Sequence, residues 1–419
     1  MSGIEASDSL QPTHASKTLR AIKAPRAVNR ITFNKSEASP GETLYVHVPK
    51  LNENEVLVPG SLALRFDINL SGGHANNYLV QNVARALVSK MVVKFASTIL
   101  QDTADHDLFK MYEDLFLLQE QRDKMFREGI QSIDLCRIRS NAGDKKTTGV
   151  DAENKLTEIY GTKYRIGLDH EILTDHGVFY PQALYDDLVF ELTLSGAAQV
   201  VKGSDPTKLK YKLTNIQLEY EMIRSPQLAE AAKSAYSSGK EFVFDHVHRE
   251  KIIPIQKGSD ARLNIKVDAQ RRSLKAILLL FTEPYTAGTR DSEKYVFPDL
   301  KKVQVTINGS PNMLYNQGIV AEDLWEEASR FLVREENKTE HMTPKLFLTG
   351  DKFGLLVDLR SMADRSMHGS GVRLVNSTDG VQLELERKAS GSGTINCQVF
   401  VISDAQLATL GNQLHSVQF

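Results

Sequence analysis

Few residues of this 419-residue chain have the types and spacing that chemistry requires, and the histidines come first. His246 and His248 alternate in the segment Asp245-His-Val-His-Arg249, so in a strand both imidazoles would lie on one face. A zinc site needs at least three protein ligands, and the sequence indicates no third one. The hypothesis of a small-barrel metalloenzyme therefore competes with a simpler interpretation, in which both histidines lie at a solvated strand edge. His170 and His176 bracket a loop and make a weaker case.

The glycine motifs that would bind nucleotides are incomplete. Gly239-Lys240 resembles the end of a phosphate-binding loop, but Glu241 stands where such a loop carries a serine or threonine for magnesium. The segment Gly369-Ser-Gly-Val-Arg373 lacks the third glycine of a dinucleotide site. No Gly-x-Ser-x-Gly sequence supports a nucleophile elbow. We therefore expect no catalytic residues, no cofactor and no bound metal.

The remaining distinctive residues favour structural roles. Cys136 and Cys397 are too few for a disulfide framework, which favours a reducing compartment. Trp325, the single tryptophan, lies beside an apolar stripe with helical spacing, so we expect it to pack. The chain start resembles no secretory signal, so we expect no glycosylation at the five Asn-x-Ser/Thr sequons, at Asn34, Asn69, Asn308, Asn337 and Asn376.

Charge is nearly balanced over the chain but not at its start. The 51 Lys and Arg against 53 Asp and Glu exclude a protein that binds nucleic acid through its overall positive field. Residues 17–30 nevertheless carry five cations and no anion, so we predict a flexible basic N-terminal arm over residues 1–30. Its candidate contact residues are Lys17, Leu19, Arg20, Ile22, Lys23, Arg26 and Arg30. Because some of these are apolar, we expect contact with another subunit before contact with nucleic acid.

Length and composition indicate a globular protein of two or three domains. Apolar residues make up 41% and charged residues 25%, which is close to the usual globular balance. The chain is about three times the size of a typical domain of roughly 150 residues. No stretch approaches the roughly 20 apolar residues of a transmembrane helix, so we expect a soluble protein made in the cytosol.

The dominant pattern is the alternation of apolar and polar residues that half-buried antiparallel strands require. It predicts strands near residues 62–70, 91–95, 188–194, 216–222, 263–267, 303–307, 381–385 and 395–401. Helical spacing predicts one helix over residues 108–118, with Asp105 as its N-cap, and a second over residues 324–332. The Gly-Ser-Gly sequence at 391–393 is typical of a hairpin turn between two C-terminal strands.

This pattern predicts an all-β protein of two tandem eight-stranded jelly rolls, with a few helices in the loops. We expect the first jelly roll at residues 31–225 and the second at 241–410. A linker helix at 226–240 would separate them, and a tail would follow at 411–419.

The order of particular segments goes further than this pattern. The segments are 82–94, 109–118, 164–168, 179–181, 213–225, 297–309, 353–359, 369–374, 381–385 and 396–401. In this order the chain, from about residue 45 to residue 405, resembles the double jelly-roll major capsid proteins of the adenovirus-like lineage, especially those of Polinton (Maverick) elements and adintoviruses. It departs from the family's usual Asn-Pro-Phe segment, which is represented here by Tyr295-Val-Phe-Pro298.

The resemblance implies a structural protein and not an enzyme. It implies homotrimeric, pseudo-hexagonal capsomers in the icosahedral capsid of a double-stranded DNA virus or virus-like element. The implied partners are the chain itself, neighbouring capsomers, penton and minor capsid proteins, and packaged DNA through a weak contact of the arm. The implied location is the virion, after synthesis in the host cytosol. The alternatives are a tandem β-sandwich module that binds carbohydrate or another ligand, and a cupin-type metalloenzyme that uses His246 and His248.

Overall fold

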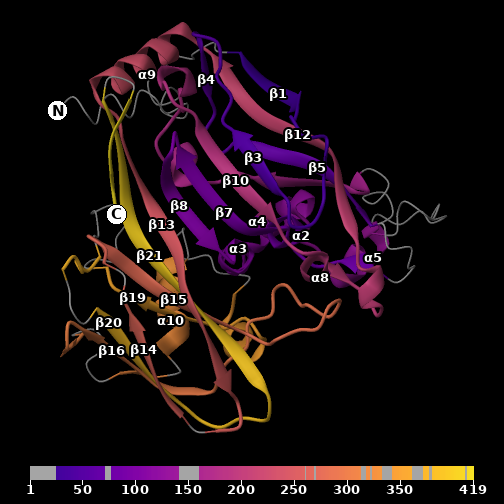
Figure 1. Ribbon diagram of the computed structural model, residues 1–419, viewed down its shortest axis with the longest axis vertical. Coiled ribbons are helices and arrows are strands. Elements are labelled where there is room, and N and C mark those ends of the chain that lie inside the picture. The colour runs from indigo at the N-terminus through magenta and orange to yellow at the C-terminus, as the bar shows by residue number, and fades with distance from the viewer. Residues whose placement is uncertain are drawn as a thin grey trace. The chain divides into compact units, whose positions relative to one another are not determined.

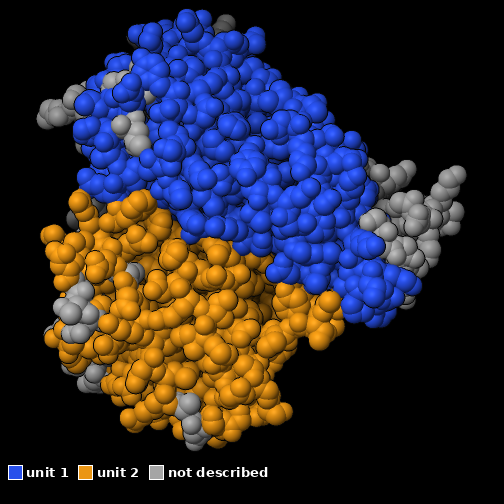
Figure 2. Space-filling view, in the orientation of Figure 1, with its two compact units in different colours: residues 1–102, 126–245, 405–418 blue, residues 103–125, 246–404, 419 orange. Residues whose placement is uncertain are grey.

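The fold consists of two compact units, which Figure 2 shows in different colours. The computed structural model describes residues 25–70, 77–140, 160–259, 261–268, 270–312, 318–320, 323–332, 342–360, 371–376, 380–410 and 413–419. Unit 1 consists of residues 1–102, 126–245 and 405–418, and unit 2 of residues 103–125, 246–404 and 419. Neither unit is one continuous stretch, in contrast to the consecutive domains expected from the sequence.

Unit 1 is built on two main antiparallel sheets (Figure 1). The first has the order β1 (Arg26–Thr32), β12 (Tyr211–Arg224), β5 (Ala63–Leu70) and β9 (Lys163–Gly167). Two short strands, β2 (Glu37–Ala38) and β4 (Glu55–Leu57), also pair with β12. The second sheet has the order β3 (Thr43–His47), β10 (Leu188–Leu194), β7 (Val88–Phe95) and β8 (Thr98–Ala104). A separate two-stranded sheet pairs β6 (Tyr78–Leu79) with β11 (Val201–Lys202).

Unit 2 also has two sheets. One has the order β13 (Glu241–Gln256), β21 (Thr394–Leu410), β15 (Leu274–Thr282) and β19 (Gly354–Asp358), and β22 (Gln413–Gln418) pairs with β21. The other has the order β14 (Ala261–Val267), β20 (Val381–Arg387), β16 (Leu300–Ile307) and β17 (Ser310–Pro311), and β18 (Ile319–Val320) pairs with β16. The chain passes between the units after Asp102 in β8, after Met125, after Asp245 in β13, after Asp404 in β21 and after Gln418.

The same topology occurs in both units. If the eight main strands of each unit are numbered in chain order, one sheet has the order 1-8-3-6 and the other 2-7-4-5. For unit 1 these strands are β1, β3, β5, β7, β8, β9, β10 and β12, and for unit 2 they are β13, β14, β15, β16, β17, β19, β20 and β21. This is the jelly-roll topology. The predicted all-β fold of two jelly rolls is therefore confirmed.

The predicted strands bury most of the side chains that the alternation assigned to the core, whereas Leu70, Leu263 and Ile307 are half-buried. Each of the eight segments lies in a strand of the structure, and in β10 every second residue is buried. Phe66 on β5 is 4% exposed, and Phe190 on β10 is completely buried. One prediction about the strands is wrong. The Gly391-Ser-Gly393 turn joins β20 to β21, which lie in different sheets, so it does not close a hairpin.

The helices lie mainly in one connection of each jelly roll, between its fifth and sixth strands. In unit 1's connection these are α3 (His106–Asp114), α4 (Gln119–Lys124), η2 (Met125–Glu128) and α5 (Ile133–Ser140), and in unit 2's they are α10 (Leu324–Leu332) and α11 (Pro344–Thr349). The shorter helices elsewhere are α2 (Val83–Ala86), α7 (Glu171–Thr174), η3 (Pro181–Ala183), α8 (Ala197–Val200) and η4 (Pro206–Lys208). In the described part of the chain, no helix is both long and apolar enough to cross a bilayer.

The expected linker helix is α9 (Pro226–Ser238), which belongs to unit 1. Ser225 is its N-cap, because the Ser225 hydroxyl accepts a hydrogen bond from the Leu228 N–H. Pro226 occupies the first helical position, where a missing N–H costs nothing. The helix ends at Gly239, whose φ of 109° disfavours residues with a Cβ.

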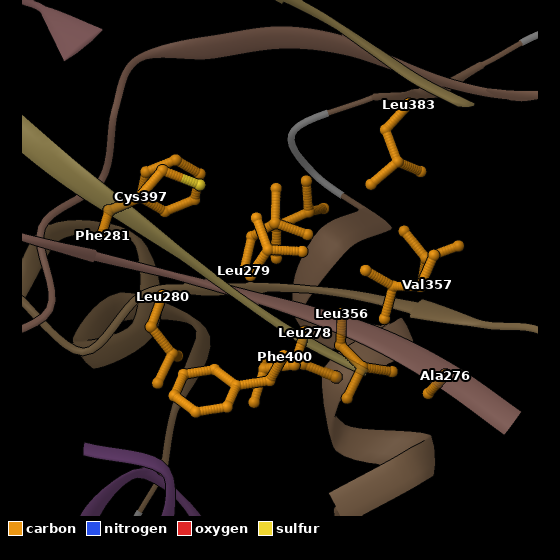
Figure 3. Close-up of a cluster of buried hydrophobic side chains, with 14 of the residues drawn as sticks. Ala276, Leu278, Leu279, Leu280, Phe281, Leu356, Val357, Leu383, Cys397 and Phe400 are labelled. Atoms are coloured by element: carbon orange, nitrogen blue, oxygen red, sulfur yellow. The ribbon is translucent and has the colours of Figure 1, made fainter. Parts of the chain in front are cut away.

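The α3 helix, predicted from the first half of the sequence, belongs to unit 2. Phe109, Tyr112, Leu115 and Phe116 are members of the hydrophobic core of unit 2. Figure 3 shows part of this core, including Phe400, whose ring centroid lies 5.5 Å from that of Phe109. Burying one such aromatic side chain stabilises a fold by roughly 1.5–3 kcal/mol. The core of unit 2 therefore depends on a segment that precedes most of unit 1 in the chain.

Asp105 begins α3, but it does not cap the helix with its side chain. Its φ is 49°, and its carboxylate makes no capping hydrogen bond. It pairs instead with the Arg249 guanidinium on β13. The predicted start of the helix is therefore right, and the predicted role of the Asp105 side chain is wrong.

Candidate assembly surface

The predicted basic arm is in part a regular strand. Its candidate residues Lys17, Leu19, Arg20, Ile22 and Lys23 lie outside the described residues. Arg26 and Arg30 lie in β1, which pairs with β12 in antiparallel register from Arg26↔Ile223 to Thr32↔Gln217. The expectation of a flexible arm over residues 1–30 therefore fails at its C-terminal end, because β1 is the first strand of the first jelly roll.

β1 forms because alternate residues of this segment face the buried side of β12, a pattern that is hard to see in the sequence among the arginines. Ala27, Asn29 and Ile31 lie opposite Met222, Tyr220 and Leu218, which are buried residues of β12. The Asn29 amide donates hydrogen bonds to the Tyr220 hydroxyl (3.3 Å) and to the Met222 sulfur (3.5 Å). The other residues of β1 point to the opposite face, where the arginines meet carboxylates.

A row of charges crosses this face of the sheet from β1 to β9. The Glu219 carboxylate on β12 lies 2.6 Å from Nε of Arg30, 3.0 Å from Nη1 of Arg65 and 3.5 Å from Nε of Arg165. Arg165 also pairs with Glu128 at 3.3 Å. Burial alone would raise the pKa of Glu219, but the hydrogen bond from Arg30 and the charges of Arg65 and Arg165 lower it below its ordinary value. Glu219 therefore remains ionised.

Both described cations of the predicted arm are thus engaged within the chain. Arg26 pairs with Glu221, although the Arg26 side chain stays 63% exposed. Arg30 pairs with Glu219 and is 53% exposed. Either residue would have to exchange its carboxylate for a phosphate to bind nucleic acid. This pairing favours a structural role for Arg26 and Arg30.

β1 lies at the end of its sheet and exposes apolar side chains. None of its seven residues is buried, and Val28 and Ile31 are 52% and 44% exposed. In the described part of the chain β12 is the strand that pairs with β1. An edge strand presents unpaired N–H and C=O groups to solvent, which a neighbouring molecule can cover. We define the candidate assembly surface as residues Arg26–Thr32.

A second exposed feature is the loop that carries Tyr185, which sequence inspection missed. Tyr185 is 71% exposed. The Lys50 ammonium donates hydrogen bonds to the carbonyls of Pro181 (3.1 Å), Leu184 (2.6 Å) and Asp186 (3.1 Å), and these bonds fix the loop. A rigid, exposed tyrosine loses little conformational entropy on binding, as is typical of residues at protein interfaces.

His246 and His248 lie on one face of β13, as predicted. Their ring centroids are 6.4 Å apart and the planes meet at 21°. The interpretation of a solvated strand edge is wrong for His246, which is only 7% exposed. Burial, followed by the charges of Arg271 and His248, lowers the pKa of His246 to about 3. Among the described residues no group of three or more possible ligands could hold a metal ion.

His170 and His176, the two weaker candidates from the sequence, make contacts within unit 1. His170 is buried, accepts a hydrogen bond from the Ile172 N–H at 3.3 Å, and lies 3.0 Å from the Gln101 side-chain oxygen. Nε2 of His176 lies 2.7 Å from the Val243 carbonyl. Burial lowers the pKa of His176, so this ring favours the neutral form.

The remaining motifs have local structural roles where the structure describes them. Lys240 donates to the His176 carbonyl at 3.3 Å, and Gly239 ends α9. Cys136 and Cys397 are buried, and burial raises the pKa of Cys397 to about 12, which disfavours the reactive thiolate. Trp325 packs, half-buried, against the core of unit 2. Asn337 of the sequons and Gly369 of the glycine motif lie outside the described residues.

Comparisons with known proteins identify the fold. No protein-family model and no curated protein sequence matches this chain. Among solved structures, the capsid of the virus PBCV-1 has a TM-score of 0.60 at 10% identity, over 96% of this chain and 98% of that chain. The Faustovirus major capsid protein has a TM-score of 0.58 at 7% identity, over 96% and 94% of the two chains.

The Sputnik virophage structure has a TM-score of 0.55 at 8% identity and covers 96% of this chain and 90% of that chain. At such identities the likeness defines the fold, and it spans both jelly rolls. The resemblance found in the sequence is therefore confirmed at the level of fold: the chain has the double jelly-roll fold of viral major capsid proteins.

Proposed function

We propose that this chain is the major capsid protein of an icosahedral double-stranded DNA virus or virus-like element, such as a Polinton. The observation that carries the proposal is the match of both jelly rolls, over 96% of the chain, to the capsid structures of PBCV-1 and Faustovirus. This match favours a capsid protein over a tandem carbohydrate- or ligand-binding module. The protein acts in the virion capsid after synthesis in the host cell.

The capsomer is a homotrimer. Each chain supplies two jelly rolls of the same topology, so three chains supply six similar blocks around a three-fold axis. In such a ring the first jelly roll of one chain contacts the second jelly roll of the next. Neighbouring capsomers, penton proteins and minor capsid proteins complete the shell. The work is structural and requires neither catalysis nor a cofactor.

The N-terminal residues hold neighbouring capsomers together. The pairing of Arg26 with Glu221 and of Arg30 with Glu219 argues against packaged DNA as the main partner, because these two cations are already engaged within the chain. The exposed edge of β1 adds apolar surface at Val28 and Ile31. Packaged DNA is at most a weak partner of the preceding residues, which include Lys17, Arg20 and Lys23.

Negative-stain imaging of the purified full-length chain tests the proposed capsomer. The expected particles have a hexagonal outline with six lobes, or form closed shells. A matched control is the variant Tyr45→Ala, which removes one exposed side chain and should give the same particles. Uniform two-lobed particles, each the size of one chain, would instead support a tandem binding module.

A further inference from the structure

Phe419 lies in an aromatic and cationic site of unit 2. Its ring centroid is 5.0 Å from that of His246, with the planes at 64°. The Arg271 guanidinium lies over the same ring, 5.7 Å from its centroid. The Phe419 carbonyl accepts a hydrogen bond of 3.2 Å from the Arg272 N–H. Phe419, which follows β22, is therefore held by His246 on β13 and by Arg271 and Arg272 before β15. We call these contacts the Phe419 latch.

The latch encloses polar atoms that no described group satisfies. Nδ1 of His246 and Nε of Arg271 are both buried and have no hydrogen-bond partner among the described residues. His246 as a residue is only 7% exposed. A buried polar group without a partner is costly, and the cost rises steeply once the group carries a charge. The latch therefore tolerates His246 only as the neutral imidazole.

The surroundings of His246 add to this cost. The charged or titratable residues on the elements that meet here are Asp245, His248 and Glu250 on β13, Arg271 and Arg272 before β15, Asp404 on β21, and His415 on β22. Of these, Arg271 and His248 act on the His246 ring, and both disfavour its protonation. Asp404 pairs with Lys275 at 3.3 Å. A proton on His246 would thus add a second cation beside Arg271.

We propose that the Phe419 latch is an acid-sensitive switch, closed around neutral His246 and opened when the imidazole takes a proton from solvent. The proton binds at Nδ1 or Nε2, and no covalent bond breaks. When Phe419 leaves, water reaches the protonated imidazole. The cation is then no longer buried against the Phe419 ring. The end of β22 loosens with Phe419, because the hydrogen bond from Arg272 is lost at the same time.

The sign of the pH dependence follows from the two states. In the open state His246 has its ordinary pKa near 6.5, and in the closed state the pKa is about 3. The closed state binds fewer protons than the open state. The contribution of His246 to the stability of the closed state is therefore complete above pH 6.5 and is lost as the pH falls toward 3. Between pH 7.5 and pH 5 the opening equilibrium should increase about 30-fold.

Hydrogen exchange of the full-length protein measures this opening. The Arg272 amide and the amides of residues 413–419 are followed by mass spectrometry at pH 7.5 and pH 5, each divided by its intrinsic rate at that pH. In the unsubstituted protein the normalised rates should rise about 30-fold at pH 5. In the Phe419→Ala variant the same amides should exchange rapidly at both pH values. Their exchange rates serve as the reference for the open state.

Two variants assign the effect to His246. His246→Phe and His246→Gln cannot take up the proton, so both should lose the pH dependence, and the second covers the case in which the larger apolar ring prevents folding. The matched control is His415→Gln, which removes an exposed histidine of β22 and should keep the full effect. A rise of less than threefold in the unsubstituted protein, or an equal rise in either His246 variant, would overturn the proposal. None of these measurements depends on the proposed capsid function.

Discussion

The guanidinium of Arg122 donates two hydrogen bonds of 3.1 Å to the carboxylate of Glu293, 171 residues further along the chain. Both side chains are nearly completely buried. A second buried pair joins Asp107 to Arg290. These pairs attach the segment 103–125 to the later part of unit 2, in addition to its apolar contacts. Folding of unit 2 therefore requires residues from both halves of the sequence.

Breaking the first of these pairs should destabilise the protein strongly. Arg122→Leu leaves the Glu293 carboxylate buried without its cation, which typically costs about 3–5 kcal/mol of unfolding free energy. The double variant Arg122→Leu with Glu293→Leu should lose less, because no uncompensated charge remains. Urea denaturation measures both values. Equal losses in the single and double variants would show that the buried charge does not cause the effect.

The core of the first jelly roll depends on the strand phase that the alternation predicts. Phe190→Ala and Phe66→Ala should each cost about 3–5 kcal/mol, since both rings are buried. Tyr45→Ala, at a position that is 52% exposed on β3, is the control and should change stability by less than about 0.5 kcal/mol. Losses below about 1 kcal/mol at both phenylalanines would mean that the strands face the other way.

Alternation predicted strands such as β10 well, because these have one buried face and one more exposed face. It did not reveal β15 or β19, because their residues are buried on both faces. The same rule could not reveal β1, because its solvated face carries Arg26 and Arg30 and its inner face carries the polar Asn29. Helical spacing identified α3 but could not place it in unit 2, since periodicity shows which face is buried and not what covers it. The burial of His246 could not be predicted for the same reason, because the ring that packs against it belongs to Phe419, far away in the sequence.

Buried arginines that bind backbone carbonyls are another feature that the sequence does not reveal. Arg387 is 1% exposed and donates to the carbonyls of Gln256 (2.8 Å), Ser259 (2.7 Å), Lys257 (3.1 Å) and Pro298 (3.2 Å). Arg139 in unit 1 is similar, and its guanidinium carbon lies 4.6 Å from the ring centroid of Phe126 and 3.8 Å from that of Tyr164. Each arginine ties loop backbone to its own unit.

Replacement of Arg387 should therefore be costly, although Arg387 forms no ion pair with the part of the chain that the structure describes. Arg387→Met leaves several carbonyls without a donor, and each buried one costs about 1–3 kcal/mol. The matched control is Lys388→Met, because Lys388 is the next residue and is exposed. Thermal unfolding should show a large decrease in Tm for Arg387→Met and almost none for Lys388→Met. Similar Tm values for the two variants would contradict the assigned role.

Truncation tests the N-terminal residues, and the structure gives the boundary. Deletion of residues 1–24 spares β1 and should leave capsomers intact while weakening shell assembly, whereas deletion of residues 1–32 should also lower Tm. The apolar changes Leu19→Ser and Ile22→Ser together should impair assembly nearly as much as the shorter deletion. Replacing Lys17, Arg20 and Lys23 with Gln should do less harm. Normal shells from the shorter deletion would contradict a role in holding capsomers.

Light scattering of the purified full-length chain at micromolar concentration tests the central claim most directly. A permanent trimer interface leaves little stable monomer, so three chains of 46.8 kDa should give a species of about 140 kDa, or a larger particle assembled from it. The mass should not change on tenfold dilution. A single species of 46.8 kDa under these conditions would contradict the assignment of this chain as a major capsid protein.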